Sequence, residues 1–187
     1  MRRARDSDYR SRAVYKLREI DQRDHLFRSG QAVVDLGAAP GSWCQYAAAR
    51  IGNSGNVLAL DILDMEPVNN VTFIRGDFTE EAILEACLGA LAARPVDLVI
   101  SDMAPNLSGI RDADQARSLQ LAELALDFAC RVLKPGGDLL VKVFQGAGTD
   151  RYREQLSQHF HKVMIRKPKA SRDASREIYM LARGYGV

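Results

Sequence analysis

The sequence predicts one α/β domain in which helices cover both faces of a mostly parallel, seven-stranded sheet, and three observations support this prediction. The 187 residues correspond in length to a single domain. Short apolar runs alternate with segments of helical periodicity, as in consecutive β-α-β units. No helical segment separates the last two apolar runs, which predicts one antiparallel strand, either at an edge of the sheet or inserted in it.

In the first half of the chain, hydrophobic spacing defines the elements. Val14, Leu17 and Ile20 recur at three-residue steps, which predicts a helix over Ser11–Asp24. The short apolar runs that follow end in Gly, Asp or Ser, as buried strands do before a loop. We expect strand Gln31–Leu36, helix Ser42–Arg50, strands Asn56–Leu60 and Val71–Ile74, helix Glu80–Ala93 and strand Val96–Ile100.

In the second half, turn residues mark the boundaries. The amphipathic segment Gln115–Lys134 is expected to form a long helix that Pro135-Gly136-Gly137 stops. We expect strand Asp138–Phe144, helix Arg151–Phe160 and strands Lys162–Arg166 and Glu177–Ala182 after it. No repeat or linker interrupts the chain, so residues 1–187 are expected to form one domain, with a basic arm and helix over 1–24 and a core over 31–183.

Charge and cysteine content exclude several classes of protein. Residues 1–18 and 162–176 each carry a net charge of +5, whereas residues 19–161 carry −8, which favours a polyanionic partner touched by the basic ends. No apolar run is long enough to span a bilayer, and the charged N-terminus does not resemble a secretory signal. The three widely spaced cysteines predict no disulfide framework, so we expect a cytoplasmic protein, and the isolated His159 and His161 predict no metal site.

A glycine loop after the first predicted strand is the first sign of a ligand site. In Gly37-Ala38-Ala39-Pro40-Gly41, glycines allow main-chain amides to approach a ligand closely. Asp61 ends the next strand, where a carboxylate can accept hydrogen bonds from ribose hydroxyls, and Asp77-Phe78 follows the third strand, where an acid and a ring can contact adenine. These features favour an adenosine-containing ligand with an amino-acid tail, because the loop lacks the further glycines of a pyrophosphate site.

Charged residues at the ends of later strands suggest a catalytic group. Lys142 lies within the apolar run Leu140–Phe144, where burial of an unpaired ammonium group would be costly. Asp102 follows the fourth strand and Glu177 enters the last one, so both can lie near this lysine. Such a group is either a structural ion pair between strands or a catalytic lysine held by carboxylates. Lys16, taken by itself, has the pattern of a surface lysine on a helix.

Five motifs resemble those of the FtsJ/RrmJ family of S-adenosylmethionine-dependent RNA 2′-O-ribose methyltransferases. They occur in the family's order and span nearly the whole chain, from about residue 10 to 183. They are Ser11–Leu17, Asp35–Trp43, Ser101–Asn106, Val141–Gly146 and Ser175–Tyr179. The resemblance implies a Rossmann-like class I methyltransferase fold. It is greatest to the bacterial branch that methylates a uridine ribose in the A loop of 23S ribosomal RNA.

The resemblance also implies roles for individual residues. The family's catalytic tetrad corresponds to Lys16, Asp102, Lys142 and Glu177, with Lys142 in its neutral form as general base for the ribose hydroxyl. The S-adenosylmethionine site is expected to comprise Gly37, Ala38, Pro40, Gly41, Trp43, Asp61, Asp77, Phe78 and Asp102. RNA contacts are expected from Arg10, Arg12, Lys167, Lys169 and Arg172.

The expected partner is 23S ribosomal RNA within the large ribosomal subunit, bound by a monomer without a metal or a membrane. Three alternatives stay open at this point. One is a 2′-O-methyltransferase that acts on transfer RNA or a messenger cap, and another is a non-catalytic ribosome-assembly factor. A nicotinamide-dependent oxidoreductase is the third, although the loop lacks the pattern Gly-x-Gly-x-x-Gly.

Overall fold

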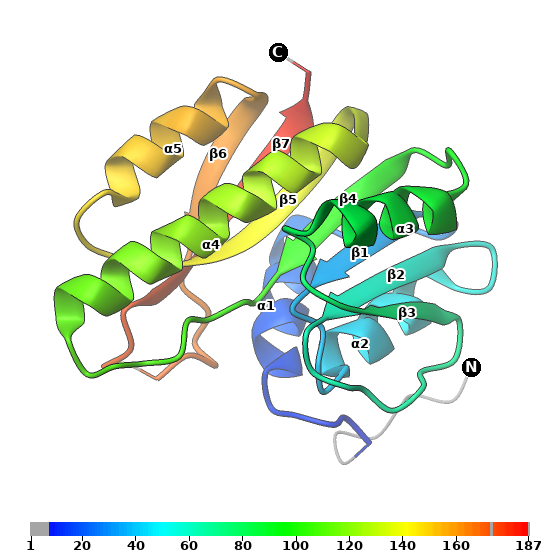
Figure 1. Ribbon diagram of the computed structural model, residues 1–187, viewed down its shortest axis with the longest axis horizontal. Coiled ribbons are helices and arrows are strands. Elements are labelled where there is room, and N and C mark those ends of the chain that lie inside the picture. Colours follow the sequence, from blue (N-terminus) through cyan, green and yellow to red (C-terminus); the bar gives the residue numbers. More distant parts are fainter. Residues whose placement is uncertain (1–7, 173, 187) are drawn as a thin grey trace.

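The computed structural model describes residues 8–172 and 174–186, and its seven strands form one sheet in the order β3-β2-β1-β4-β5-β7-β6 (Figure 1). The strands are β1 Ala32–Leu36, β2 Asn56–Asp61, β3 Val71–Arg75, β4 Val96–Ser101, β5 Leu133–Phe144, β6 Phe160–Arg166 and β7 Glu177–Tyr185. The helices are α1 Val14–Asp24, α2 Ser42–Ile51, α3 Glu81–Leu91, α4 Arg111–Val132 and α5 Thr149–Ser157. The predicted mostly parallel α/β architecture is confirmed.

The antiparallel strand is β7, and it lies inside the sheet. It pairs antiparallel with both β5 and β6, whereas β1 pairs parallel with β2 and β4. Of the two positions that the sequence left open, the inserted one is therefore correct. The pairing sets Glu177 opposite Phe144 and Tyr179 opposite Lys142, so the start of β7 meets the end of β5.

Helices cover both faces of the sheet, and each face has its own apolar core. Buried side chains of α1 and α2 pack on one face together with residues such as Val33 and Leu98. Buried side chains of α3, α4 and α5 pack on the other face with residues such as Val34 and Val141. Figure 1 shows these two layers, with α4 lying across β4 and β5. Alternate residues of one strand face opposite cores, as the pleat requires.

Most predicted boundaries agree with the structure within a few residues, and three differ for identifiable reasons. Helix α4 begins at Arg111, four residues early, because its polar first turn is held by Asp114, whose carboxylate accepts hydrogen bonds from Ser108 and Gly109. Helix α5 ends at Ser157 because β6 already starts at Phe160.

The third difference concerns the residues between α4 and β5. Leu133 pairs with Val96, but the next paired residues are Leu98 and Asp138. The segment expected to end the helix, Pro135-Gly136-Gly137, therefore forms an irregularity within β5.

Helix α1 is fixed to distant parts of the chain. Arg166 at the end of β6 makes two hydrogen bonds to the Asp24 carboxylate, at 2.8 and 2.7 Å. Glu19 accepts hydrogen bonds from the main-chain amides of Lys169 and Ala170 in the loop that follows β6. These contacts hold Lys16 of α1 at the edge where β5 ends and β7 begins.

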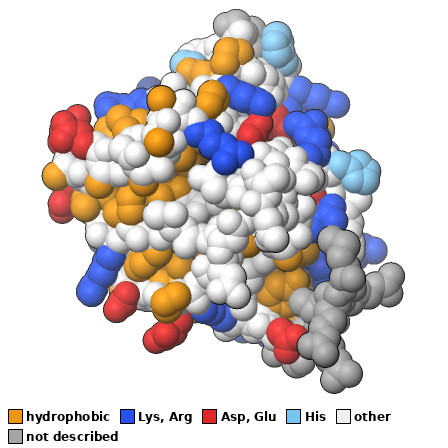
Figure 2. All heavy atoms as spheres, turned by 90° about the vertical axis from the view of Figure 1, so that its right-hand side faces the viewer, with side chains coloured by type: hydrophobic (Ala, Val, Ile, Leu, Met, Phe, Trp, Pro, Cys, Tyr) orange, Lys and Arg blue, Asp and Glu red, His pale blue; other side chains and the backbone are white. Residues whose placement is uncertain are grey.

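Two surface properties complete the description. None of the helices in the described part of the chain is both long and apolar enough to cross a membrane. Figure 2 views the side on which β2, β3 and α3 lie in Figure 1, and there basic and acidic side chains are interspersed with hydrophobic ones.

A buried carboxyl group links β1 to α2. Asp35 is 1% exposed, and the Cys44 thiol donates a hydrogen bond of 3.0 Å to its carboxyl group. Burial raises the pKa of Asp35 to about 7, with help from the charges of Asp102 and Asp61 and against the hydrogen bond from Cys44. Burial also raises the pKa of the Cys44 thiol, so the thiol stays protonated as a donor.

The raised pKa of Asp35 predicts a particular dependence of stability on pH. The folded protein keeps a proton that the unfolded chain releases near its usual pKa of 3.8. The stability linked to that proton is therefore complete below about pH 4 and is lost as the pH rises to about 7. From pH 5 to pH 8, the free energy of unfolding should fall by about 3 kcal/mol more in the wild type than in Asp35→Asn.

Urea unfolding of both proteins at several pH values measures this difference. Asn is a matched replacement because its side-chain oxygen can still accept the thiol hydrogen of Cys44. If the free energy of unfolding changes with pH in the same way in both proteins, Asp35 is ionised in the folded protein throughout this range.

Candidate active site

Two lysines and two carboxylates meet where β4 and β5 end and β7 begins. The Lys16 ammonium group lies 2.9 Å from the Glu177 carboxylate, and Lys142 Nζ lies 3.7 Å from the other oxygen of that carboxylate. Lys142 Nζ also lies 3.2 Å from the Asp102 carboxylate and donates a 2.8 Å hydrogen bond to the Asp102 main-chain carbonyl. The four residues expected to be catalytic thus form one continuous cluster.

Burial distinguishes the two lysines. Lys142 is 6% exposed, whereas the side chains of Lys16, Asp102 and Glu177 keep 18%, 18% and 23% of their surface. An ammonium group in this position needs acceptors, and Asp102 and Glu177 supply them. Burial by itself raises the pKa of Glu177, but the hydrogen bond from Lys16 and the charges of Lys142 and Lys16 outweigh it, so the pKa is lowered. Glu177 is therefore an anion at neutral pH.

Tyr179 belongs to this cluster, although the sequence analysis did not include it among the site residues. Its hydroxyl donates a 2.6 Å hydrogen bond to the Asp102 carboxylate. Burial, followed by the charge of Asp102 and this hydrogen bond, raises its pKa well above the usual value, so the hydroxyl keeps its proton. The strand pattern could have identified it, because residues two apart on a strand share a face and Tyr179 follows Glu177 by two.

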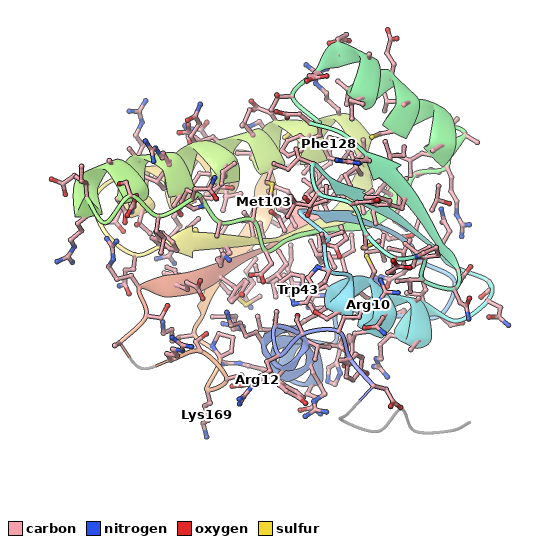
Figure 3. The ribbon with its side chains drawn as sticks, turned by 60° about the horizontal axis from the view of Figure 1, so that its bottom comes forward. Arg10, Arg12, Trp43, Met103, Phe128 and Lys169 are labelled. Carbon is pink, nitrogen blue, oxygen red and sulfur yellow. The ribbon has the colours of Figure 1, made fainter. Side chains whose placement is uncertain are left out.

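Trp43 connects the helices behind the cluster. Its indole N–H donates a 2.9 Å hydrogen bond to the carbonyl of Ala13, and its ring lies 5.8 Å from that of Tyr179. At 3% exposure, Trp43 is part of the core beneath α1 and α2. Figure 3 shows it at the centre of the molecule, between the sheet and α1.

The glycine loop lies over the ends of β1 and β2 and has little free space at its glycines. Gly37 and Gly41 have φ values of 73° and 109°, which glycine adopts without strain. A Cβ atom at Gly37 would come within 2.5 Å of the Met103 side chain, and one at Gly41 would come within 2.9 Å of the Met65 sulfur. Side chains are thus excluded from both positions by conformation and by contact.

The Asp61 side chain accepts a hydrogen bond from the main chain of this loop. One carboxylate oxygen accepts a 2.9 Å hydrogen bond from the amide of Ala39, and the other accepts one from the amide of Leu63. The carboxylate is partly exposed, as are Ala39 and Gly37 of the loop. Ala38 and Pro40 complete the loop, which the Ala39-Pro40 cis peptide bond shapes. The predicted ribose-binding acid thus lies beside the predicted loop.

The acid and the ring after β3 make contacts of their own. An oxygen of Asp77 accepts hydrogen bonds from the Thr79 amide and hydroxyl, at 2.9 and 2.7 Å. The Phe78 ring packs edge-on against Phe128 of α4, with 5.9 Å between the ring centroids. Phe78 therefore contacts the core on the α3 and α4 side, and its place at an adenine ring stays a prediction.

Arg10, expected to contact RNA, makes three hydrogen bonds to main-chain carbonyl groups. Its guanidinium group donates to the carbonyls of Pro40, Glu66 and Pro67, at 3.0, 2.6 and 2.7 Å. It thereby ties the N-terminal segment to the glycine loop and to the loop after β2. These partners lie 30 to 57 residues away, so no local signal predicts them.

Two of the other four basic residues of the predicted RNA site line one open cavity of about 680 Å³. Arg12 and Arg172 line it together with Lys16 and Glu177 of the cluster. The Lys167 ammonium group donates instead to the carbonyls of Ser175 and Glu177, at the base of the loop between β6 and β7. Exposed Lys169 lies at the outer end of this loop, beyond Arg12 (Figure 3).

Metal-binding chemistry has no candidate cluster in this part of the protein. Among residues 8–172 and 174–186, no group of three or more His, Cys, Asp or Glu residues is arranged to hold a metal ion.

Comparison with known proteins gives close matches over nearly the whole chain. A family model described as FtsJ-like methyltransferase matches residues 9–185. Two relatives named ribosomal RNA large subunit methyltransferase E, from Alkalilimnicola ehrlichii and Pseudomonas aeruginosa, are 62% and 57% identical to the chain. The matches cover 98% and 97% of the chain and 88% of each relative.

Solved structures agree with this assignment. A structure described as a ribosomal RNA methyltransferase from Plasmodium falciparum has a TM-score of 0.86 at 30% identity, over 95% of this chain and 98% of that one. Human methyltransferase-like protein 13 in complex with SAH has a TM-score of 0.60 at 14% identity, over 92% and 80% of the two chains, which supports the fold alone. The predicted Rossmann-like methyltransferase fold is confirmed, and the chain belongs to the FtsJ-like methyltransferase family.

Proposed function

We propose that this protein transfers a methyl group from S-adenosylmethionine to the ribose 2′-oxygen of a uridine in the A loop of 23S ribosomal RNA. The observation that carries the proposal is the continuous cluster of Lys16, Glu177, Lys142 and Asp102, of which Lys16 and Glu177 line a cavity together with two arginines. The name that the relatives from Alkalilimnicola and Pseudomonas carry supports ribosomal RNA of the large subunit as the substrate.

The residues of the glycine loop fit an S-adenosylmethionine-type cofactor. Because Gly37 and Gly41 have no Cβ atoms, the loop packs closely against Met103 and Met65, and Asp61 keeps a partly exposed carboxylate for ribose hydroxyls. We assign Gly37, Ala38, Pro40, Gly41 and Asp61 to this site, with Asp77 and Asp102 at the neighbouring strand ends. When bound, S-adenosylmethionine supplies a methyl group on a positively charged sulfur. The protein's task is to bring a deprotonated oxygen to that group.

Lys142 is the proposed general base. The Lys142 ammonium group lies between the carboxylates of Asp102 and Glu177 and must first release one proton to solvent. The neutral amine then has two hydrogens and one lone pair, and the carbonyl and carboxylate oxygens of Asp102 are the nearest acceptors for the hydrogens. The lone pair is then left to accept the proton of the 2′-hydroxyl group. Once Lys142 carries that proton, the same two carboxylates stabilise its charge.

Lys16 and Tyr179 are proposed to hold these carboxylates in place. Lys16 binds the Glu177 oxygen that is not the one near Lys142. Tyr179 donates to the same Asp102 oxygen that lies near Lys142. Glu177 is thus contacted at both of its oxygens and Asp102 twice at one oxygen, which limits the positions open to Lys142. Such fixed placement of reacting groups contributes much of the rate in group transfer.

RNA is proposed to enter over the carboxyl ends of the parallel strands, with phosphates at Arg12, Lys169 and Arg172. The exposed guanidinium groups of Arg12 and Arg172 line the cavity beside the cluster. We further propose that the protein acts in the cytoplasm as a monomer and without a metal ion. Recognition by RNA shape and the 2′-hydroxyl group accords with a cavity built from charged and small side chains.

Methyl transfer from labelled S-adenosylmethionine tests the substrate. The acceptors are large ribosomal subunits from cells that lack this protein, naked ribosomal RNA and bulk transfer RNA. Label on a 2′-oxygen of the subunit is expected, and mapping places it within the A loop. Label on transfer RNA alone would contradict the proposed substrate but agree with the proposed 2′-O-methyl transfer. Cofactor binding without label on any acceptor would favour a non-catalytic assembly factor.

Replacement of Lys142 should separate catalysis from cofactor binding. In Lys142→Ala, kcat should fall by at least about 10³-fold because the proton acceptor is lost. The dissociation constant for S-adenosylmethionine, measured by calorimetry, should stay within about threefold of the wild type. Lys142→Arg keeps a positive charge but its guanidinium group stays protonated, so it should also be inactive. Substantial turnover in either variant would exclude Lys142 as the base.

Removal of the Arg10 guanidinium group should weaken cofactor binding. In Arg10→Ala, the loops at Pro40 and at Glu66–Pro67 lose their common donor, so the glycine loop becomes less ordered. We expect the dissociation constant for S-adenosylmethionine to rise about tenfold, with kcat at saturating cofactor within about threefold. Arg23→Ala, on the exposed face of α1, is the matched control. Equal affinities in all three proteins would contradict a role for Arg10 at the cofactor loop.

Charge removal at the cavity should change the salt dependence of RNA binding. Arg12→Ala and Arg172→Ala should each weaken binding and reduce the slope of log K against log salt by about one. Arg153→Ala on α5 serves as control because it removes an exposed arginine away from the cavity. If the slopes of all three variants equal that of the wild type, phosphates do not bind at the cavity.

A further inference from the structure

The loop between β4 and α4, which starts at Asp102 of the active site, exposes two large apolar side chains. Leu107 is 70% exposed and Ile110 is 65% exposed, and these are the highest values among the exposed large hydrophobic residues in the described part of the chain. The loop starts at Asp102, a member of the catalytic cluster, and ends where α4 begins at Arg111. Leu107 lies five positions after Asp102, so the extended chain can carry it no more than about 18 Å from the Asp102 backbone.

This loop is held in place and does not cover its own apolar groups. Asp114 is 4% exposed, and its carboxylate accepts hydrogen bonds from the Ser108 amide and hydroxyl at 2.8 and 2.7 Å and from the Gly109 amide at 3.2 Å. The Ser108 hydroxyl oxygen also accepts a hydrogen bond from the Ile110 amide. A buried anion thus fixes the turn between Leu107 and Ile110, and both side chains are presented to solvent.

Basic groups lie next to the exposed pair. Arg111 follows Ile110 directly and is exposed. Arg117, also exposed, donates a 3.5 Å hydrogen bond from its guanidinium group to the carbonyl of Asn106, the residue before Leu107. An apolar surface bordered by guanidinium groups matches a nucleotide, in which an apolar base face is attached to an anionic phosphate.

The position of the loop relative to the basic cavity supports the same occupant. Figure 3 shows the segment after Met103 running along one side of the ends of β5 and β7, towards the start of α4. Lys169 and Arg12, near the cavity, lie on the other side of these strands (Figure 3). A chain that crosses the ends of these strands from the cavity therefore meets the segment after Met103, which carries Leu107 and Ile110.

We infer that Leu107 and Ile110 bind the face of an unpaired RNA base that neighbours the methylated nucleotide. Apolar side chains bind unstacked bases in this way and hold the nucleotide strand in an extruded conformation. The inference rests on the proposed function, since it takes RNA as the substrate. It adds a base-binding surface to a site that otherwise contacts phosphates and one ribose.

Binding of large ribosomal subunits from cells that lack this protein tests the inference. In Leu107→Ser and Ile110→Ser, the dissociation constant for subunits should rise about five- to tenfold, and about 30-fold or more in the double variant. The kcat at saturating subunits and the dissociation constant for S-adenosylmethionine should stay within about threefold of the wild type. Leu107→Met and Ile110→Val should bind like the wild type because they keep apolar surface.

Two controls make the result specific. Leu88→Ser removes a 42% exposed leucine from α3 and should leave binding unchanged. The salt slope should be unchanged in Leu107→Ser but reduced by about one in Arg117→Ala, because only the latter loses a phosphate contact. Serine variants that bind subunits like the wild type, or a loss equal to that of Leu88→Ser, would overturn the inference. Wild-type protein that binds RNA but transfers no methyl group would overturn the proposed function instead.

Discussion

The buried ammonium group of Lys142 is the constraint around which this end of the molecule is organised. A charge that is 6% exposed must be surrounded by acceptors, and no residue near it in sequence supplies them. Asp102 comes from β4 and Glu177 from β7, so the strand order β4-β5-β7 brings one carboxylate to each side of the lysine. Insertion of β7 beside β5 is therefore a requirement of the site as well as a feature of the fold.

Local sequence signals predicted the fold because strands and turns are defined by neighbouring residues. The alternation of apolar runs and helices identified seven strands, and the lack of a helix between the last two identified the antiparallel one. Element boundaries that depend on distant partners were harder to predict from the sequence. Helix α4 starts at Arg111 because of the Asp114 hydrogen bonds, and the Pro135-Gly136-Gly137 segment is absorbed into β5 through pairing with β4.

The site could be predicted in part, for the same physical reason. The sequence identifies Asp102, Lys142 and Glu177 as candidate site residues because each is a charged residue within an apolar run or at its end. Lys16 has no such signal and was identified only through the family resemblance. Arg10 and Lys167 carry the positive charge expected of RNA contacts. Their side chains nevertheless bind carbonyl groups of segments that only the tertiary fold brings near. Composition reports the charge of a residue but not the group that it faces.

The position of β7 also bears on how the protein is made. Synthesis proceeds from the N-terminus, and domains begin to form while the chain emerges. Until Glu177–Tyr185 is available, β5 is an open edge and β6 has no strand to pair with, because β7 separates the two. An emerging chain can assemble β1 to β5 and still lack the acid and the tyrosine beside Lys142. The sheet is thus completed in the same step that brings Glu177 to Lys142, so a nascent chain that stops before β7 lacks part of the proposed catalytic cluster.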